Sequence, residues 1–277
     1  MNVEGLFWDL YRAPVEVDVE RILKRYGLLQ SPAHWRPYGQ NESNFGVVEN
    51  QQASPIPALI EKITNSIDAI LVRRCLEKGL DPRSSAAPQS IDAAITDFFP
   101  DHKNWDISKT RRIQAENLQI IADPKSPKLE TSLIIYDDGE GQRPEDFEST
   151  FLSLLRGNKN EIHFVQGKYS MGGAGAVAFC GRRRYQLVAS KRFDGHSPFG
   201  FTLVRRHPLT AEEEQRKKST WYEYLIMDGT IPSFSCGPLE LGLHNRAFKT
   251  GTVIKLYSYD LPAGSRSVIS RDLNQSV

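Results

Sequence analysis

Apolar residues recur along the first part of the chain with the spacing of amphipathic helices, and the spacing changes after Leu118. The strongest helical pattern covers Ala58–Arg74 and directly follows Pro55 and Pro57, which suit the start of a helix. From Leu118 onwards, short runs rich in β-branched and aromatic residues are typical of strands. The predicted helices are Val15–Tyr26, Ala58–Arg74, Ile91–Phe99, Ser108–Glu116 and Pro144–Leu155. The predicted strands are Leu118–Ile121, Ser132–Tyr136, Tyr185–Lys191, Phe199–Arg205, Trp221–Met227 and Thr252–Tyr259.

The order of these elements predicts an α+β fold. Consecutive strands without long helices between them favour antiparallel pairing, and the breaker-rich ADPKSPKLET between the first two strands indicates a hairpin. We therefore expect a two-layer α/β sandwich, with a mostly antiparallel sheet covered by helices on one face. Residues 1–50 are expected to form an N-terminal arm or strap, residues 51–260 the main domain with an insertion at 75–117, and residues 261–277 a tail or the start of a truncated second domain.

Composition limits the classes of function. The 277 residues include 35 Lys plus Arg and 34 Asp plus Glu, so the net charge of +1 provides no overall field that attracts nucleic acid or membranes. Cys75, Cys180 and Cys236 fit no zinc spacing and leave one cysteine unpaired in any disulfide scheme, as expected in a reducing compartment. The first residues do not resemble a secretory signal, and no apolar run reaches the roughly 18 residues that span a bilayer. The sequence predicts a cytoplasmic protein without membrane contact.

The helix predicted at Ala58–Arg74 carries a polar stripe of Glu61, Asn65 and Asp68. Glu61 and Asn65 are four residues apart, so both side chains can point at the same bound group. Asn is a poor helix former, so its presence in the middle of a helix indicates that its side chain has a role there. The alternative is an ordinary helix with a solvated polar face and an aliphatic face toward the core. The aliphatic face consists of Leu59, Ile60, Ile63, Ile67, Ile70 and Leu71.

The segment IIYDDGEGQ combines a strand end with carboxylates and glycines. Asp137 ends an apolar run, and Gly139 and Gly141 follow it closely. A carboxylate at this point can accept a hydrogen bond from a buried donor, while backbone without a Cβ lets a flat ligand approach. This combination suits the amino group of adenine. The alternative is a turn in which Asp-Gly simply supplies left-handed torsion angles.

The glycine-rich stretch GKYSMGGAGAVAFCG is a candidate phosphate site. Gly172, Gly173 and Gly175 precede a small-residue run that can begin a helix, where free backbone N–H groups would cradle phosphate, and Lys168 would add positive charge. The alternative is that small residues here only allow tight helix packing. The stretch also matches the dinucleotide pattern GxGxxA, but the strand near Tyr185 follows too soon for the usual crossover helix.

Taken in order, EKITNSIDA, DDGEG and the glycine-rich stretch resemble the three nucleotide-binding boxes of the GHKL ATPase superfamily. This superfamily includes DNA gyrase B subunits, heat-shock chaperones of the ninety-kilodalton class, sensor histidine kinases, MutL and MORC proteins. A fourth segment, KTGTVIKLY, resembles the late strand whose threonine helps to hold adenine. The resemblance covers about residues 51–260 and implies a MORC-like or MutL-like ATPase domain of the Bergerat fold.

The resemblance also implies roles for individual residues. Glu61 would be the general base that activates water, and Asn65 would ligate Mg²⁺. Asp137 would bind the adenine amino group, Asp68 would brace the pocket, and a mobile lid would lie between Leu155 and Met171. The residues that the resemblance assigns to nucleotide binding are Asn65, Asp137, Gly139, Gly141, Lys168, Gly172, Gly173, Gly175 and Thr252.

The implied function is Mg²⁺-dependent hydrolysis of ATP. Histidine kinases generally carry Asn where this chain has Glu61, so water is favoured as the phosphate acceptor. Gyrase, MutL and MORC proteins use a lysine from a second domain, and only residues 261–277 follow the last strand, so we expect slow turnover unless another domain or a partner protein supplies such a lysine. The resemblance further implies an ATP-dependent homodimer formed through the N-terminal arm, with DNA as a candidate partner in a phage-defence or related role. The alternatives are a chaperone-like client clamp and a nucleotide-dependent interaction module with negligible catalysis.

Overall fold

The computed structural model describes residues 2–104, 115–154, 161–167, 172–216 and 218–261. Its centre is an eight-stranded sheet in the order β1-β6-β5-β4-β8-β3-β2, with β7 paired to β5 beside this path. Neighbouring strands pair antiparallel throughout, as the sequence predicts. The strands are β1 (Trp35–Pro37), β2 (Leu118–Ala122), β3 (Leu133–Asp137), β4 (Gln186–Lys191), β5 (Phe199–Arg206), β6 (Tyr222–Leu225), β7 (Ser233–Phe234) and β8 (Gly251–Leu256).

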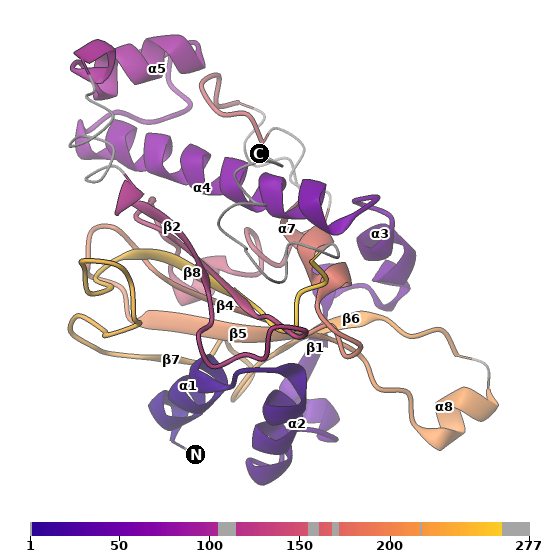
Figure 1. Ribbon diagram of the computed structural model, residues 1–277. Helices are drawn as coiled ribbons and strands as arrows, with labels where there is room; N and C mark the ends of the chain where they lie inside the picture. The colour runs from indigo at the N-terminus through magenta and orange to yellow at the C-terminus, as the bar shows by residue number, and fades with distance from the viewer. Residues whose placement is uncertain (1, 105–114, 155–160, 168–171, 217, 262–277) are drawn as a thin grey trace.

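The longest helix, α4 (Pro55–Glu77), crosses one face of the sheet, and α5 (Ile91–Phe98) lies beyond it on the same side (Figure 1). Ala58 and Leu59 of α4 pack in one cluster with Leu133, Ile135 and Leu256 of the central strands. The remaining helices are α1 (Val3–Arg12), α2 (Glu16–Arg25), α3 (Phe45–Glu49), α7 (Gly172–Gly175) and α8 (Ala211–Gln215), with short 3₁₀ turns between them. The α+β fold class and the antiparallel sheet expected from the sequence are confirmed.

Helices cover both faces of the sheet and not only the one face expected. In Figure 1, α1 and α2 lie on the side opposite to α4. Phe7 of α1 is fully buried, and its ring lies 4.8 Å from that of Phe199 and 5.4 Å from that of Phe201, both on β5. The first residues, expected as an arm, thus contribute to the core, and α1 was not predicted from the sequence at all.

Residues 144–154, the described part of the helix predicted at Pro144–Leu155, do not form that helix. A 3₁₀ turn at Pro144–Asp146 is followed by irregular turns. The hydroxyls of Ser149 and Thr150 donate to the backbone carbonyl of Asp146, at 3.0 and 2.7 Å, and such local bonds compete with the helix ladder. The helix predicted at Ser108–Glu116 lies almost entirely outside the described residues, as does the tail after residue 261. No helix in the described part of the chain is long and apolar enough to cross a membrane.

The register of three central strands aligns polar side chains on the face that α4 covers. Thr252 of β8 lies opposite Asp137 of β3 on one side and opposite Ser190 of β4 on the other. Since alternate residues of a strand point to the same face, Leu133 and Ile135 share the face of Asp137, and both pack beneath α4. The row of Asp137, Thr252 and Ser190 therefore faces the space between α4 and the sheet.

Candidate functional site

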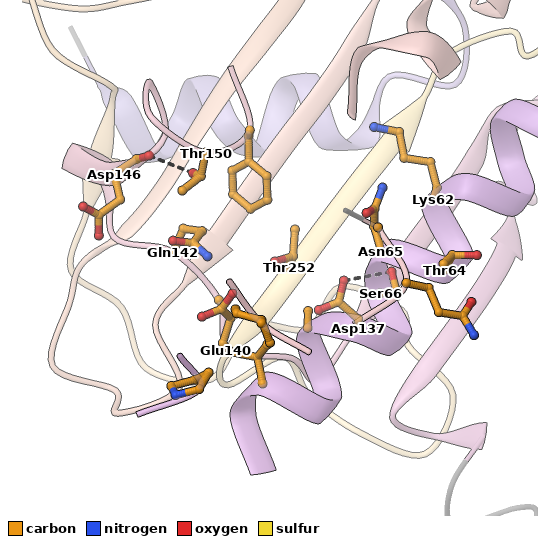
Figure 2. Close-up of a pocket in the computed structure, with 18 of the residues that line it drawn as sticks. Lys62, Thr64, Asn65, Ser66, Asp137, Glu140, Gln142, Asp146, Thr150 and Thr252 are labelled. Carbon is orange, nitrogen blue, oxygen red and sulfur yellow. Dashed lines mark hydrogen bonds between the residues drawn. The ribbon is translucent and has the colours of Figure 1, made fainter. Parts of the chain in front are cut away.

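A cavity of about 1360 Å³ lies between α4 and the sheet (Figure 2). Five of the residues that the sequence suggested for a nucleotide site line it. They are Glu61, Asn65, Asp137, Gly141 and Thr252. These residues come from a helix, from a strand end with the turn after it, and from a late strand, so the fold brings together three segments that are far apart in the sequence. The volume is larger than that of most small-molecule sites, which enclose about 300 to 1,000 Å³.

Asp137 forms the acidic point at one end of the cavity. Its side chain is buried, at 5% exposure. Ser66 of α4 donates its hydroxyl proton to Oδ2 of Asp137 at 3.0 Å, a bond drawn in Figure 2, and the backbone N–H of Gly139 donates to Oδ1 at 3.1 Å. The two bonds fix the plane of the carboxylate and tie the end of β3 to α4.

Thr252 belongs to a hydroxyl network beside Asp137. The hydroxyl of Ser190 donates to the carbonyl of Gly251 at 2.8 Å and accepts the backbone N–H of Gln142 at 2.9 Å. The hydroxyl oxygens of Ser190 and Thr252 are 3.1 Å apart. Because Ser190 has only one proton and gives it to Gly251, Thr252 is the donor in this contact. The remaining capacity of the Thr252 hydroxyl is then that of an acceptor.

Beyond this polar end, the floor of the cavity becomes apolar and then polar again. Val188 lies two residues before Ser190 on β4, and Ile254 lies two residues after Thr252 on β8. Both line the cavity. Gln186 lies two residues further along β4, at 2% exposure, and its Oε1 finds no hydrogen-bond partner among the described residues. Buried polar atoms are almost always hydrogen-bonded, so Gln186 suits a ligand group or water that donates to it.

Glu61 lies at the end of the cavity near α7. Its Oε2 accepts a hydrogen bond from Nε2 of Gln52 at 2.5 Å. Gln52 in turn lies against Gly175 of α7, where an added Cβ would come within 3.0 Å of Cγ of Gln52. The missing side chain at Gly175 thus lets α7 approach the segment that holds Glu61.

Asn65 and Asp68 face the segment that ends at Gly167. A Cβ at Gly167 would lie 2.7 Å from Oδ1 of Asn65 and 3.0 Å from Oδ2 of Asp68, so a larger residue here would force these side chains to move. Asp68 is fully buried and accepts the backbone N–H groups of Gln166 and Gly167 at 2.9 and 2.8 Å. Asp68 thus holds Gln166 and Gly167, two residues that line the cavity.

Gly139 and Gly141 are required by contacts within the chain. At Gly141, φ is +58°, and a Cβ would lie only 2.0 Å from the carbonyl oxygen of Lys191. At Gly139, a Cβ would lie 2.5 Å from that of Ala69 on α4. Gly141 lines the cavity, whereas Gly139 packs against the helix. Gly139 was expected to let a ligand approach the backbone, but what approaches it closely is helix α4.

The glycine-rich stretch differs from the expected loop. Gly172, Gly173 and Gly175 lie inside the short helix α7, not before a helix, and a 3₁₀ turn over Ala176–Phe179 continues it. Lys168 and most of the predicted lid between residues 155 and 171 lie outside the described residues. The small residues allow α7 to pack closely against the chain before α4.

Helix α4 does not bury the whole aliphatic face of its sequence. Ile67 of that face is 44% exposed, whereas Leu59 and Leu71 are buried together with Lys62 and Ser66. The polar side of the helix faces the sheet because the cavity lies between them and takes up the polar side chains.

Lys62 and Ser66 line the cavity and were not found from the sequence. Lys62 is only 5% exposed, and burial lowers its pKa to about 8, although the nearby Glu61 opposes that shift. A lysine on the inward side of a helix beside Glu61 is a signal that a helical projection could have detected. Ser66, like Ser190, has no such signal, because its role depends on the register of distant strands.

Comparison with protein-family models and with curated protein sequences finds no match. Among the described residues, no group of three or more His, Cys, Asp and Glu side chains is arranged to hold a metal ion. What the cavity does offer is a fixed carboxylate, an apolar floor and, at the other end, a carboxylate beside an amide and a lysine.

Proposed function

We propose that the chain binds ATP together with Mg²⁺ in the cavity beneath α4 and hydrolyses it. The observation that carries this proposal is that Glu61 and Asn65 line the same cavity as Asp137, which Ser66 ties to the same helix. The order of the sequence motifs supports the same conclusion, since it is that of the GHKL ATPases.

The base would lie at the end formed by Asp137 and Thr252. The fixed carboxylate suits the exocyclic amino group of adenine, because the amino N–H can donate a hydrogen bond to a carboxylate oxygen. Val188 and Ile254 provide an apolar surface for the flat ring. The unpartnered Oε1 of Gln186 supports a ligand or water at the inner floor of the cavity.

The phosphates would extend toward Asn65 and Glu61. An amide oxygen is a hard ligand, so Asn65 would hold Mg²⁺ together with phosphate oxygens and water. A bound Mg²⁺ neutralises the charge that develops on the phosphates during transfer. Glu61, oriented by its bond from Gln52, would accept the proton of the attacking water.

The test is a calorimetric titration of the purified chain with ATP and Mg²⁺, combined with a phosphate-release assay. We expect saturable binding and slow, Mg²⁺-dependent release of phosphate. A Glu61→Ala variant should still bind ATP but no longer release phosphate, because the carboxylate acts on the attacking water and does not contact adenine. Absence of ATP binding by the folded protein would reject the proposal, and unchanged turnover by the variant would reject the role of Glu61.

A further inference from the structure

Lys62 has an unusual position for a lysine. It lies on the long helix α4, it is 5% exposed, and it lines the same cavity as Glu61 and Asn65. Figure 2 shows its side chain extending from α4 into the cavity on the side of Asn65. Lysine side chains are rarely this deeply buried, because removing the ammonium from water is costly.

The electrostatic surroundings of Lys62 are those of the α7 end of the cavity. Groups near Lys62 include Glu61 on the same helix and Cys180 at the end of the 3₁₀ turn that follows α7. Burial raises the pKa of Cys180, so this thiol is neutral and adds no charge. Burial also keeps the pKa of Lys62 well below its ordinary value, which means that the site holds its ammonium at a cost in solvation. An additional anion in the cavity would offset that cost.

The order of residues along α4 indicates which part of a ligand Lys62 meets. Ser66, which bonds to Asp137, lies one turn beyond Lys62 on the same side of the helix. Glu61 lies beside Lys62 and is held by Gln52, against which α7 packs. A nucleotide with its base at Asp137 would direct its phosphates toward this end.

We propose that Lys62 is the cation that contacts the terminal phosphates of the bound nucleotide, a contact for which the sequence alone suggested a lysine from a second domain or a partner. The inference rests on the proposed function and adds to it the source of the positive charge. An ammonium is a compact point charge with three donors, which suits phosphate oxygens without a fixed geometry. The ligand class that this end of the cavity selects is then a nucleoside di- or triphosphate, and not a nucleoside.

The experiment compares the affinities of ATP, ADP and adenosine for wild type, Lys62→Met and Lys62→Arg, by calorimetry in the presence of Mg²⁺. Lys128→Met is the matched control, because Lys128 is exposed in the turn between β2 and β3. We expect Lys62→Met to weaken ATP binding by about tenfold or more, the effect of losing a hydrogen bond to a charged group, and to leave adenosine binding within about twofold of wild type. Lys62→Arg should restore part of the lost ATP affinity, and Lys128→Met should change none of the three values.

The outcomes separate this inference from the proposed function. If wild type binds ATP and Lys62→Met binds it equally well, Lys62 does not contact phosphate, while the proposed function stands. If Lys62→Met weakens adenosine and ATP by the same factor, the lysine acts on the base or on the fold, and the inference is overturned. If wild type binds none of the three ligands, the proposed function itself fails and Lys62 has no phosphate to meet. Circular dichroism of each variant checks that it is folded. If Lys62→Met is not folded, the affinities of Lys62→Arg for the three ligands are compared with those of wild type.

Discussion

At the scale of single residues, the hydroxyl of Ser66 and the N–H of Gly139 hold the carboxylate of Asp137 in a fixed orientation. An Asp137→Asn substitution keeps the size of the side chain but turns one of its two acceptor positions into a donor. One of these bonds, or the bond to an adenine amino group, is then lost. We expect ATP affinity to fall by about 1.5 to 3 kcal/mol, measured by calorimetry with a Ser66→Ala variant for comparison. An unchanged dissociation constant would contradict the assignment of the base to Asp137.

The buried ammonium of Lys62 predicts a pH dependence of stability. The pKa of Lys62 is about 8 in the folded chain, against an ordinary value of 10.5 for the unfolded chain. Between these values the unfolded chain binds more protons, so the free energy of unfolding gains a contribution that increases as the pH rises. From pH 7 to pH 11, wild type should gain about 3 kcal/mol relative to Lys62→Met. Urea denaturation of both proteins at several pH values measures this difference, and parallel curves would show that the lysine is not desolvated.

Single residues also show how much of the site the sequence contains. Glu61, Asn65 and Asp137 could be predicted because their chemical types and local spacing already indicate a role, and all three line the cavity. Ser66 and Ser190 could not, because a serine becomes part of the site only through the register that brings α4 and β4 to Asp137 and Thr252.

At the scale of elements, α4 shows that an apolar pattern does not decide which side of a helix is buried. Leu59 of α4 is fully buried against the sheet, while Ile67, from the same aliphatic face of the helix, is 44% exposed. We expect Leu59→Ala to lower the free energy of unfolding by about 2 to 5 kcal/mol and Ile67→Ala to change it by less than about 1 kcal/mol. Chemical denaturation tests both. Equal losses would indicate that Ile67 is covered in solution.

Asp68 links α4 to the segment that ends at Gly167. Asp68→Asn would replace one acceptor oxygen by an amide group that cannot accept the N–H of Gln166 or Gly167. The variant should lose about 1 to 3 kcal/mol of stability because a buried donor is left unsatisfied. It should also exchange the amide protons of Gln166 and Gly167 faster than wild type. Unchanged protection of these two amides would argue that other contacts hold the segment.

At the scale of the whole molecule, the sheet could be predicted, but the helical layer on the face opposite to α4 could not. The strands follow from runs with the composition of strands, and six of the eight were located from the sequence. The helix α1 also has a readable pattern, with Leu6, Phe7 and Leu10 at helical spacing, but nothing in residues 1–50 specifies that it closes the second face of the sheet. That information is in the side chains of β5, which alternate between the two faces and present Phe199 and Phe201 to α1.

The burial of Phe7 makes α1 part of the core and not a detachable arm. Phe7 is fully buried against Phe199 and Phe201, on the face of the sheet opposite to the cavity. Phe7→Ala should therefore lower the free energy of unfolding by about 3 to 5 kcal/mol, the usual cost of removing a buried phenylalanine, and leave the ATP affinity of the folded protein unchanged. Trp8→Ala, on the half-buried side of the same helix, is the matched control and should cost less. Urea denaturation and calorimetry give the two quantities separately. If Phe7→Ala leaves stability unchanged, α1 behaves as a detachable arm; if it weakens ATP binding at full folding, the two faces of the sheet are coupled.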